Sequence, residues 1–92
     1  MGGFSWEFTP KAEKKFRKLD TTARKRILAW LETNIQDADN PRLLGESLEG
    51  DFQTLWKYRV GKYRIIADIQ DGDFLVLVVK TGKREDVYKR GI

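Results

Sequence analysis

Basic and aromatic residues alternate along one short stretch of the chain, and their spacing suits phosphate chemistry. Residues 56–64 read Trp-Lys-Tyr-Arg-Val-Gly-Lys-Tyr-Arg and contain no acidic residue. In a β-strand, successive side chains point to opposite faces, so Lys57 and Arg59 share one face. The other face carries Trp56, Tyr58 and Val60. One face then carries cations and the other can pack against a core. We interpret this strand as a phosphate-binding surface.

A third cation, Arg64, follows the turn at Gly61-Lys62 and joins Lys57 and Arg59 on the same face if the hairpin is tight. Neighbouring like charges repel, so a fold tolerates them most readily where a site receives an anion. The alternative is a merely solvated sheet face. Such a face usually mixes acids among the bases, and this stretch has none, which favours the anion site.

A second basic and aromatic cluster lies near the C-terminus. Arg84 and Tyr88 stand four residues apart after Gly82. On one helical turn they would present a guanidinium and a phenol on the same side, a pairing that suits phosphate contact with base stacking or proton transfer. A frayed C-terminus, in which Tyr88 only covers the edge of the core, explains the same spacing.

Composition excludes several kinds of chemistry. Residues 1–92 suffice for one small domain with a modest core. The chain has no cysteine and no histidine, which excludes disulfides, thiolate or imidazole metal sites and histidine acid–base catalysis. Acidic residues 71 and 73 belong to a turn, and 85 and 86 balance local charge, so we expect no metal and no other cofactor.

The longest apolar run, Phe74 to Val79, is too short to cross a membrane, and the N-terminus lacks the features of a signal peptide. We therefore expect a soluble, cytoplasmic protein. The formal net charge is +4 and the isoelectric point is about 9.5. Cations concentrate in residues 11–26 and acids in residues 32–51. This polarity suits nucleic acid binding, although a solvated helix face is the simpler interpretation of residues 11–26.

Apolar periodicity predicts the element order β-α-α-β-β-β, an α+β fold. Residues 4–8 alternate as a strand with one buried face. Thr9 before Pro10 is a typical helix start, and residues 20–22 offer a break and a second cap. A longer helix then presents an apolar stripe from Ala23 to Ile35. The two helices should form an antiparallel hairpin.

The remaining residues predict three strands after an exposed connection. Residues 37–50 read as that connection, with a short turn of helix in it. Strands should cover residues 52–60 and 63–69, and Asp71-Gly72 is typical of a hairpin turn. Residues 74–79 are apolar on both faces, so this strand should lie centrally and pair with both the preceding strand and the N-terminal one. The sheet is small and mainly antiparallel, with the helices on one face and the cations on the other.

With this order of elements, residues 55–64 and the ending Gly82-Lys83-Arg84-Glu85-Asp86-Val87-Tyr88 resemble the RelE branch of the RelE/ParE toxin superfamily, across nearly the whole chain. The resemblance implies a RelE-like fold and a toxin of a bacterial or archaeal type II toxin–antitoxin system. Such toxins enter the ribosomal A site and cut mRNA there. The residues 55–64 motif is shared across the superfamily, whereas the cations and the tyrosine are more specific to the ribonuclease branch.

Carried over by position, the resemblance implies a catalytic set of Lys57, Arg59, Arg64, Arg84 and Tyr88. The reaction would be attack by an mRNA 2′-hydroxyl on its adjacent phosphodiester, without a metal. Arg64 and Arg84 would neutralise the phosphorane, Lys57 would act as base if neighbouring cations favour its neutral form, and Tyr88 would stack on a base or transfer a proton. Arg59 replaces a lysine of the family pattern and, remaining protonated, stabilises charge rather than shuttling a proton.

The resemblance also implies partners: a RelB-like antitoxin, the ribosome and mRNA, with no membrane. Two alternatives stay open, a ParE-like DNA gyrase poison and a non-catalytic RNA-binding or partner-binding module. Arg84 and Tyr88 favour the nuclease, whereas Arg59 keeps the alternatives open. The flanking cations that we expect to contact RNA or the ribosome are Lys14, Lys18, Lys62, Lys83, Lys89 and Arg90.

Overall fold

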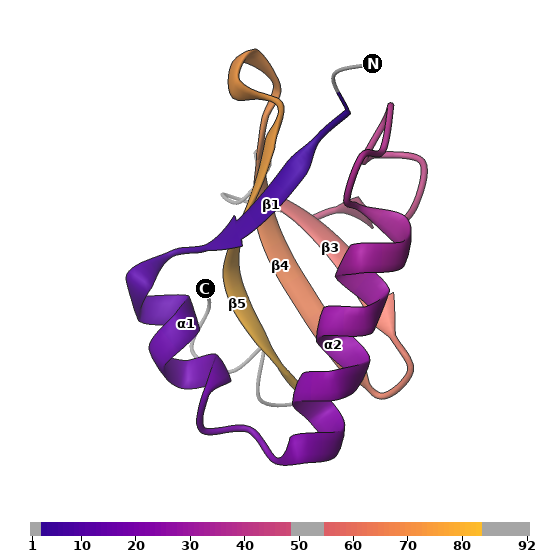
Figure 1. Ribbon diagram of the computed structural model, residues 1–92. Coiled ribbons are helices and arrows are strands. Elements are labelled where there is room, and N and C mark those ends of the chain that lie inside the picture. Colours follow the sequence, from indigo (N-terminus) through magenta and orange to yellow (C-terminus); the bar gives the residue numbers. More distant parts are fainter. Residues whose placement is uncertain (1–2, 49–54, 84–92) are drawn as a thin grey trace.

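The chain folds as a mixed sheet with two helices. The computed structural model describes residues 3–48 and 55–83, and neither described helix is long and apolar enough to span a membrane. The α+β class is confirmed. The elements in chain order are β1 (Ser5–Phe8), α1 (Pro10–Phe16), α2 (Thr21–Asn34), β2 (Glu46–Ser47), β3 (Leu55–Val60), β4 (Tyr63–Gln70), a 3₁₀ turn (Asp71–Asp73) and β5 (Leu75–Lys83) (Figure 1).

The strands form one sheet in the order β1-β5-β4-β3-β2. Strand β1 runs parallel to β5, and every other neighbouring pair is antiparallel. The most apolar strand, β5, therefore lies between β1 and β4, which confirms the central position predicted from its sequence. Strand β5 extends to Lys83, well beyond the predicted residues 74–79, with a register irregularity opposite Ile66/Ala67.

Both helices lie on one face of the sheet (Figure 1). Helix α1 begins where the sequence predicts, because the Thr9 hydroxyl accepts a hydrogen bond of 3.0 Å from the backbone N–H of Ala12, and Pro10 takes the first position. Helix α1 packs against β5 and β1, whereas α2 packs against β3 and β4. Each helix thus covers a different half of the same sheet face.

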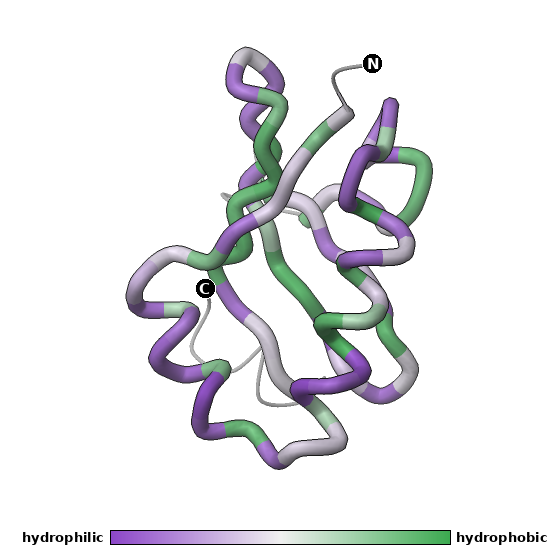
Figure 2. The backbone as a smooth tube through the Cα atoms, viewed as in Figure 1, coloured by the Kyte–Doolittle hydropathy of each residue, from purple (hydrophilic) through white to green (hydrophobic). Residues whose placement is uncertain are grey.

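The core fills the space between the helices and the sheet. Ile27 and Leu31 of α2 are completely buried, as are Tyr58 of β3 and Ile65 of β4. The rings of Trp30 and Tyr58 lie 4.9 Å apart between their centroids. Figure 2 shows apolar residues concentrated on the central strands. The predicted inward orientation of Tyr58 is therefore confirmed, and the cation-bearing face of β3 points away from the helices.

The connection after α2 differs from the prediction. Its described part, residues 37–48, contains the short strand β2 and no helical turn. Gly45 takes a positive φ of 78°, which turns the chain so that Glu46 and Ser47 can pair with β3. Two residues are too few to carry a recognisable alternation, so sequence periodicity missed this strand. The predicted start of the next strand, residues 52–54, lies outside the described residues.

The turn before β5 also differs from the sequence prediction. Asp71-Gly72 was expected to form a tight hairpin turn, but the chain makes a 3₁₀ turn over Asp71–Asp73 and then places Phe74 in the left-handed region, with φ 50°. Phe74 is 54% exposed and lies outside the strand. Positive φ is uncommon for phenylalanine. The apolar run 74–79 therefore predicted a strand that begins at Phe74, whereas β5 begins at Leu75.

Replacing Leu31 by alanine should strongly destabilise the protein. Leu31 is completely buried between α2 and the sheet, and a buried leucine-to-alanine change typically costs about 2–5 kcal/mol. Leu28, on the same helix, is 37% exposed, so Leu28→Ala is a matched control that should cost clearly less. Urea denaturation of both variants measures the difference. Equal losses would show that α2 does not pack on the sheet through the Leu31 side.

Candidate phosphate-binding site

A two-residue turn brings the predicted cations together. Strands β3 and β4 are joined at Gly61-Lys62, where Gly61 has φ 60°, and the ladder then pairs Arg59 directly with Arg64. Lys57 lies two residues before Arg59 and therefore on the same face. Lys57, Arg59 and Arg64 thus share the sheet face opposite the helices, as the alternation predicts. Their chemical roles stay a prediction.

Arg64 is more buried than a simple surface cation. It is only 9% exposed, and its Nη1 donates hydrogen bonds to the carbonyls of Gly61 and Tyr63, at 2.9 and 2.8 Å. Nε and Nη2 make no hydrogen bond with the described residues. The turn therefore holds one side of the guanidinium in place, and within the described part of the chain its other donors are not used. Arg59, opposite, is exposed.

The cationic face contains an acid that the local sequence did not reveal. Glu46 of β2 pairs in register with Lys57 of β3, and its Oε2 lies 3.6 Å from the Lys57 ammonium. The Glu46 side chain is 70% exposed and that of Lys57 is 26% exposed. The expectation that this face carries no acid is therefore wrong. The acid comes from a separate strand, eleven positions earlier in the chain, which a reading of residues 56–64 alone does not include.

These charged side chains line a groove at the edge of β3. Strand β2 pairs with Trp56 and Lys57, so among the described residues no strand pairs with β3 on this side beyond Lys57. The groove has a volume of about 710 Å³. It is lined by residues of α2, the connection, β2 and the β3–β4 hairpin: Trp30, Asn34, Leu44, Gly45, Glu46, Lys57, Arg59 and Arg64.

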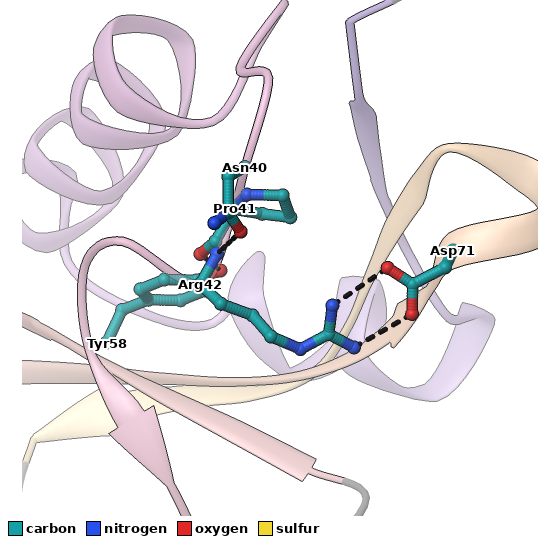
Figure 3. Close-up of polar contacts among 5 residues, drawn as sticks. All are labelled: Asn40, Pro41, Arg42, Tyr58 and Asp71. Carbon is teal, nitrogen blue, oxygen red and sulfur yellow. Dashed lines mark hydrogen bonds and ion pairs between the residues drawn. The ribbon is translucent and has the colours of Figure 1, made fainter.

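The connection that carries Glu46 is fastened to the sheet by polar contacts. Arg42 makes a two-pronged ion pair with Asp71, at 2.8 and 2.9 Å, and the Tyr58 hydroxyl donates to the carbonyl of Pro41 (Figure 3). The indole N–H of Trp56 donates to the Leu44 carbonyl at 2.6 Å. Burial raises the pKa of Tyr58, so its hydroxyl stays protonated and remains a donor.

Gly45 completes this attachment. A Cβ at position 45 would lie 2.2 Å from the backbone oxygen of Lys57, closer than real Cβ atoms approach. The connection therefore passes against β3 at a distance that only glycine permits, at a φ that also favours glycine. Together these contacts hold Glu46 beside Lys57, so the acid–base arrangement is a built feature of the fold.

The structure places the other predicted residues in different locations. Lys62 is exposed at the hairpin turn, with its ammonium 5.7 Å from the Tyr63 ring centroid, and Lys83 is exposed at the end of β5. Lys14 and Lys18 are exposed on and just after α1. Because α1 packs against β5 and β1, these two cations are not gathered with the groove, which lies at β3. Residues predicted at positions 84, 88, 89 and 90 lie outside the described residues.

Sequence reasoning also missed Lys80. Burial, and the positive charges of Lys15 and Lys11, lower its pKa. Lys80 pairs with Ile66, which in turn pairs with Lys57, so a second cation stands in the same row across the sheet. Lys80 follows the apolar run 74–79 directly, and no local pattern marks it as a site residue. The position of Lys80 depends on the irregular register between β4 and β5.

Comparisons with known proteins agree with this fold. A family model described as the ParE toxin of the type II toxin–antitoxin system parDE matches residues 6–88. The mRNA interferase toxin RelE of Escherichia coli K12 is 30% identical over 90 residues, which cover 94% of this chain and 90% of that protein. The chain belongs to the RelE/ParE toxin superfamily. It is a RelE-like toxin of the type II toxin–antitoxin class.

Solved structures of RelE proteins have a fold similar to that of this chain. A doubly substituted E. coli toxin RelE in the free state superimposes with a TM-score of 0.73 at 26% identity, covering 91% of this chain and 86% of that one. The toxin–antitoxin complex RelBE2 from Mycobacterium tuberculosis gives a TM-score of 0.79 at 20% identity, with 89% and 92% coverage. The second likeness concerns the fold alone.

The Arg42–Asp71 ion pair should make stability depend on pH. A hydrogen bond from Arg42 lowers the pKa of Asp71 below its ordinary value of 3.8. The stabilisation is therefore present above that ordinary value and is lost as the pH falls through the lower, folded value. Asp71→Asn should unfold at a lower temperature than the wild type at pH 7, and the difference should vanish in strong acid.

Thermal unfolding followed by circular dichroism from pH 7 to pH 2 measures the difference in unfolding temperature between Asp71→Asn and the wild type. Asp39→Asn is the matched control, because Asp39 is an exposed acid of the same connection without an ion pair among the described contacts. A constant difference between Asp71→Asn and the wild type across the whole pH range would contradict the assignment.

Proposed function

We propose that this toxin cleaves mRNA in the ribosomal A site by metal-independent attack of a 2′-hydroxyl on the adjacent phosphodiester. The observation that carries the proposal is the pairing of Arg59 with Arg64 in a groove that Lys57 also lines. The name of the E. coli relative, an mRNA interferase, supports the same reaction class. The products are a 2′,3′-cyclic phosphate and a 5′-hydroxyl. The site of action is the cytoplasm, where translating ribosomes lie.

The two arginines suit the charge that develops in this reaction. The phosphorane-like transition state carries more negative charge than the phosphodiester, and guanidinium groups offer planar, permanently charged donors for it. Arg64 is held in advance by the turn carbonyls, so little reorganisation is needed when charge develops. Removing one such preorganised donor typically costs about 10²–10³-fold in rate.

In this proposal the ribosome aligns the mRNA for the reaction. Because the chain has no histidine, acid–base catalysis on free RNA should be weak. Holding the 2′-oxygen in line with the phosphorus and the departing oxygen is itself worth several kcal/mol of barrier. In this proposal Arg84 adds a phosphate contact and Tyr88 stacks on a base, whereas Lys62, Lys83, Lys89 and Arg90 contact RNA phosphates around the site.

We also propose a RelB-like antitoxin as the partner. Structural neighbours include RelB–RelE complexes from E. coli and Pyrococcus horikoshii, which supports this class of partner. Such an antitoxin would cover the cations of the groove or displace the C-terminal segment. Either contact blocks the approach of RNA phosphate.

A ParE-like gyrase poison is the second candidate, because the matching family model carries the ParE name. That activity needs the fold but gives Arg59 and Arg64 no role in phosphate chemistry. The two functions therefore differ in what fails first when the protein is produced in cells.

Production of the toxin without an antitoxin should stop translation before DNA synthesis. Pulse labelling with an amino acid and with thymidine measures the order, and primer extension on a reporter mRNA maps the cuts. Incorporation of the amino acid should fall first, with cuts at codons occupied by ribosomes. Early DNA breakage with intact mRNA would assign the protein to the gyrase poisons instead.

Arg59 should act through its charge. Arg59→Ala should lose on the order of 10²-fold in ribosome-dependent cleavage. Arg59→Lys keeps the positive charge and loses only the planar donor geometry, so it should stay within roughly tenfold of the wild type. Lys25→Ala removes one exposed charge from α2 and controls for general electrostatic attraction. An equal loss in Arg59→Ala and Lys25→Ala would remove Arg59 from the site.

A further inference from the structure

We propose that Glu46 is the general base of the cleavage reaction. This inference rests on the proposed function and names the group that takes the proton from the attacking 2′-hydroxyl. It replaces the earlier expectation that Lys57 acts as base. Lys57 becomes the residue that positions Glu46.

The proposal follows from which groove residues can accept a proton. Arg59 and Arg64 remain protonated at every relevant pH, and the ammonium of Lys57 pairs with Glu46. The chain has no histidine, and neither an indole nor an amide side chain is a useful base at neutral pH. Among the described residues that line the groove, Glu46 carries the only carboxyl group, and a carboxylate oxygen can accept a proton.

The arrangement of the strands puts Glu46 within reach of a bound phosphodiester. Glu46 stands opposite Lys57, and Arg59 stands two residues further along β3 on the same face. Neighbouring strands lie about 4.8 Å apart, and alternate residues of a strand are about 6.6 Å apart. A phosphate between Arg59 and Arg64 therefore has its adjacent ribose within a side-chain length of Glu46. The carboxylate is 70% exposed, so RNA can approach it.

The fold holds this carboxylate rather than leaving it on a loose loop. The preceding residue, Gly45, passes in direct contact with the backbone of β3, and the connection is fastened by Trp56 and Tyr58. The Lys57 ammonium, 3.6 Å from Oε2, steadies the side chain. A base oriented by a second group in this way is a common feature of acid–base sites.

The proton and bond changes balance within this site. Glu46 takes the proton of the 2′-hydroxyl, the 2′-oxygen forms a bond to phosphorus, and the bond from phosphorus to the 5′-oxygen breaks. The departing 5′-oxygen takes a proton from water, and Glu46 later releases its proton to solvent. Arg59 and Arg64 stabilise the charge on the non-bridging oxygens throughout.

The test separates binding from cleavage in Glu46→Gln, which keeps the shape of the side chain and removes its charge. Loss of a negative charge beside three cations should leave RNA affinity unchanged or higher, while the single-turnover cleavage rate on programmed ribosomes should fall by about 10²-fold or more. If Glu46 only balanced charge, binding and cleavage would rise together. Equal cleavage by Glu46→Gln and wild type overturns the inference.

The pH dependence gives a second, independent readout. Between pH 7 and pH 9, cleavage by Glu46→Gln should rise with hydroxide, approaching tenfold per pH unit, because solvent must then remove the proton. The wild-type rate should change much less over this range. A Glu46→Gln profile parallel to that of the wild type overturns the assignment of a base.

Controls distinguish this inference from the proposed function. Glu46→Asp should keep part of the activity, and Glu32→Gln, an exposed acid on α2, should cleave at the wild-type rate. Unchanged thermal unfolding of Glu46→Gln excludes misfolding. Wild-type protein that leaves ribosome-bound mRNA intact overturns the proposed function and this inference together, whereas wild-type cleavage with a fully active Glu46→Gln overturns the inference alone.

Discussion

The pairing of β3 with β4 through Gly61-Lys62 is the constraint on which the site depends. It brings Arg59 opposite Arg64 and sends Tyr58 into the core, where it is completely buried. A slip of one residue in this pairing would send the cations toward the helices and the aromatic ring toward solvent. The hydrophobic core therefore fixes the position of the face that carries Lys57, Arg59 and Arg64.

The same pairing explains how the fold tolerates close positive charges. Directly opposed like charges destabilise a sheet, and Arg59 and Arg64 are such a pair. Two backbone carbonyls of the turn accept hydrogen bonds from Arg64, and Glu46 pairs with Lys57. Part of the positive charge is thus compensated in the free protein, and part remains for an anionic ligand. This balance lets the fold tolerate the cations and agrees with the proposal that they bind RNA phosphate.

Much of this arrangement could be predicted from sequence, because period-2 and period-3.6 patterns report burial directly. The central position of β5, the cap at Thr9 and the shared face of Lys57 and Arg59 all follow from local patterns. The position of Glu46 does not follow from any local pattern. It depends on a two-residue strand that has no period and on a glycine turn that brings distant residues together. Long-range pairings of this kind carry no local signal, and here one of them supplies the only acid among the described residues lining the groove.

The central claim is that a phosphodiester binds on the β3–β4 face between Arg59 and Arg64. The most direct measurement is an NMR titration of the free toxin with a short RNA that carries a 2′-deoxynucleotide at the scissile position, so that it binds without being cut. The account predicts that the largest shifts occur at the Nε–H signals of Arg59 and Arg64. Shifts concentrated on the exposed cations of α1 and α2, with Arg59 and Arg64 unmoved, would contradict it.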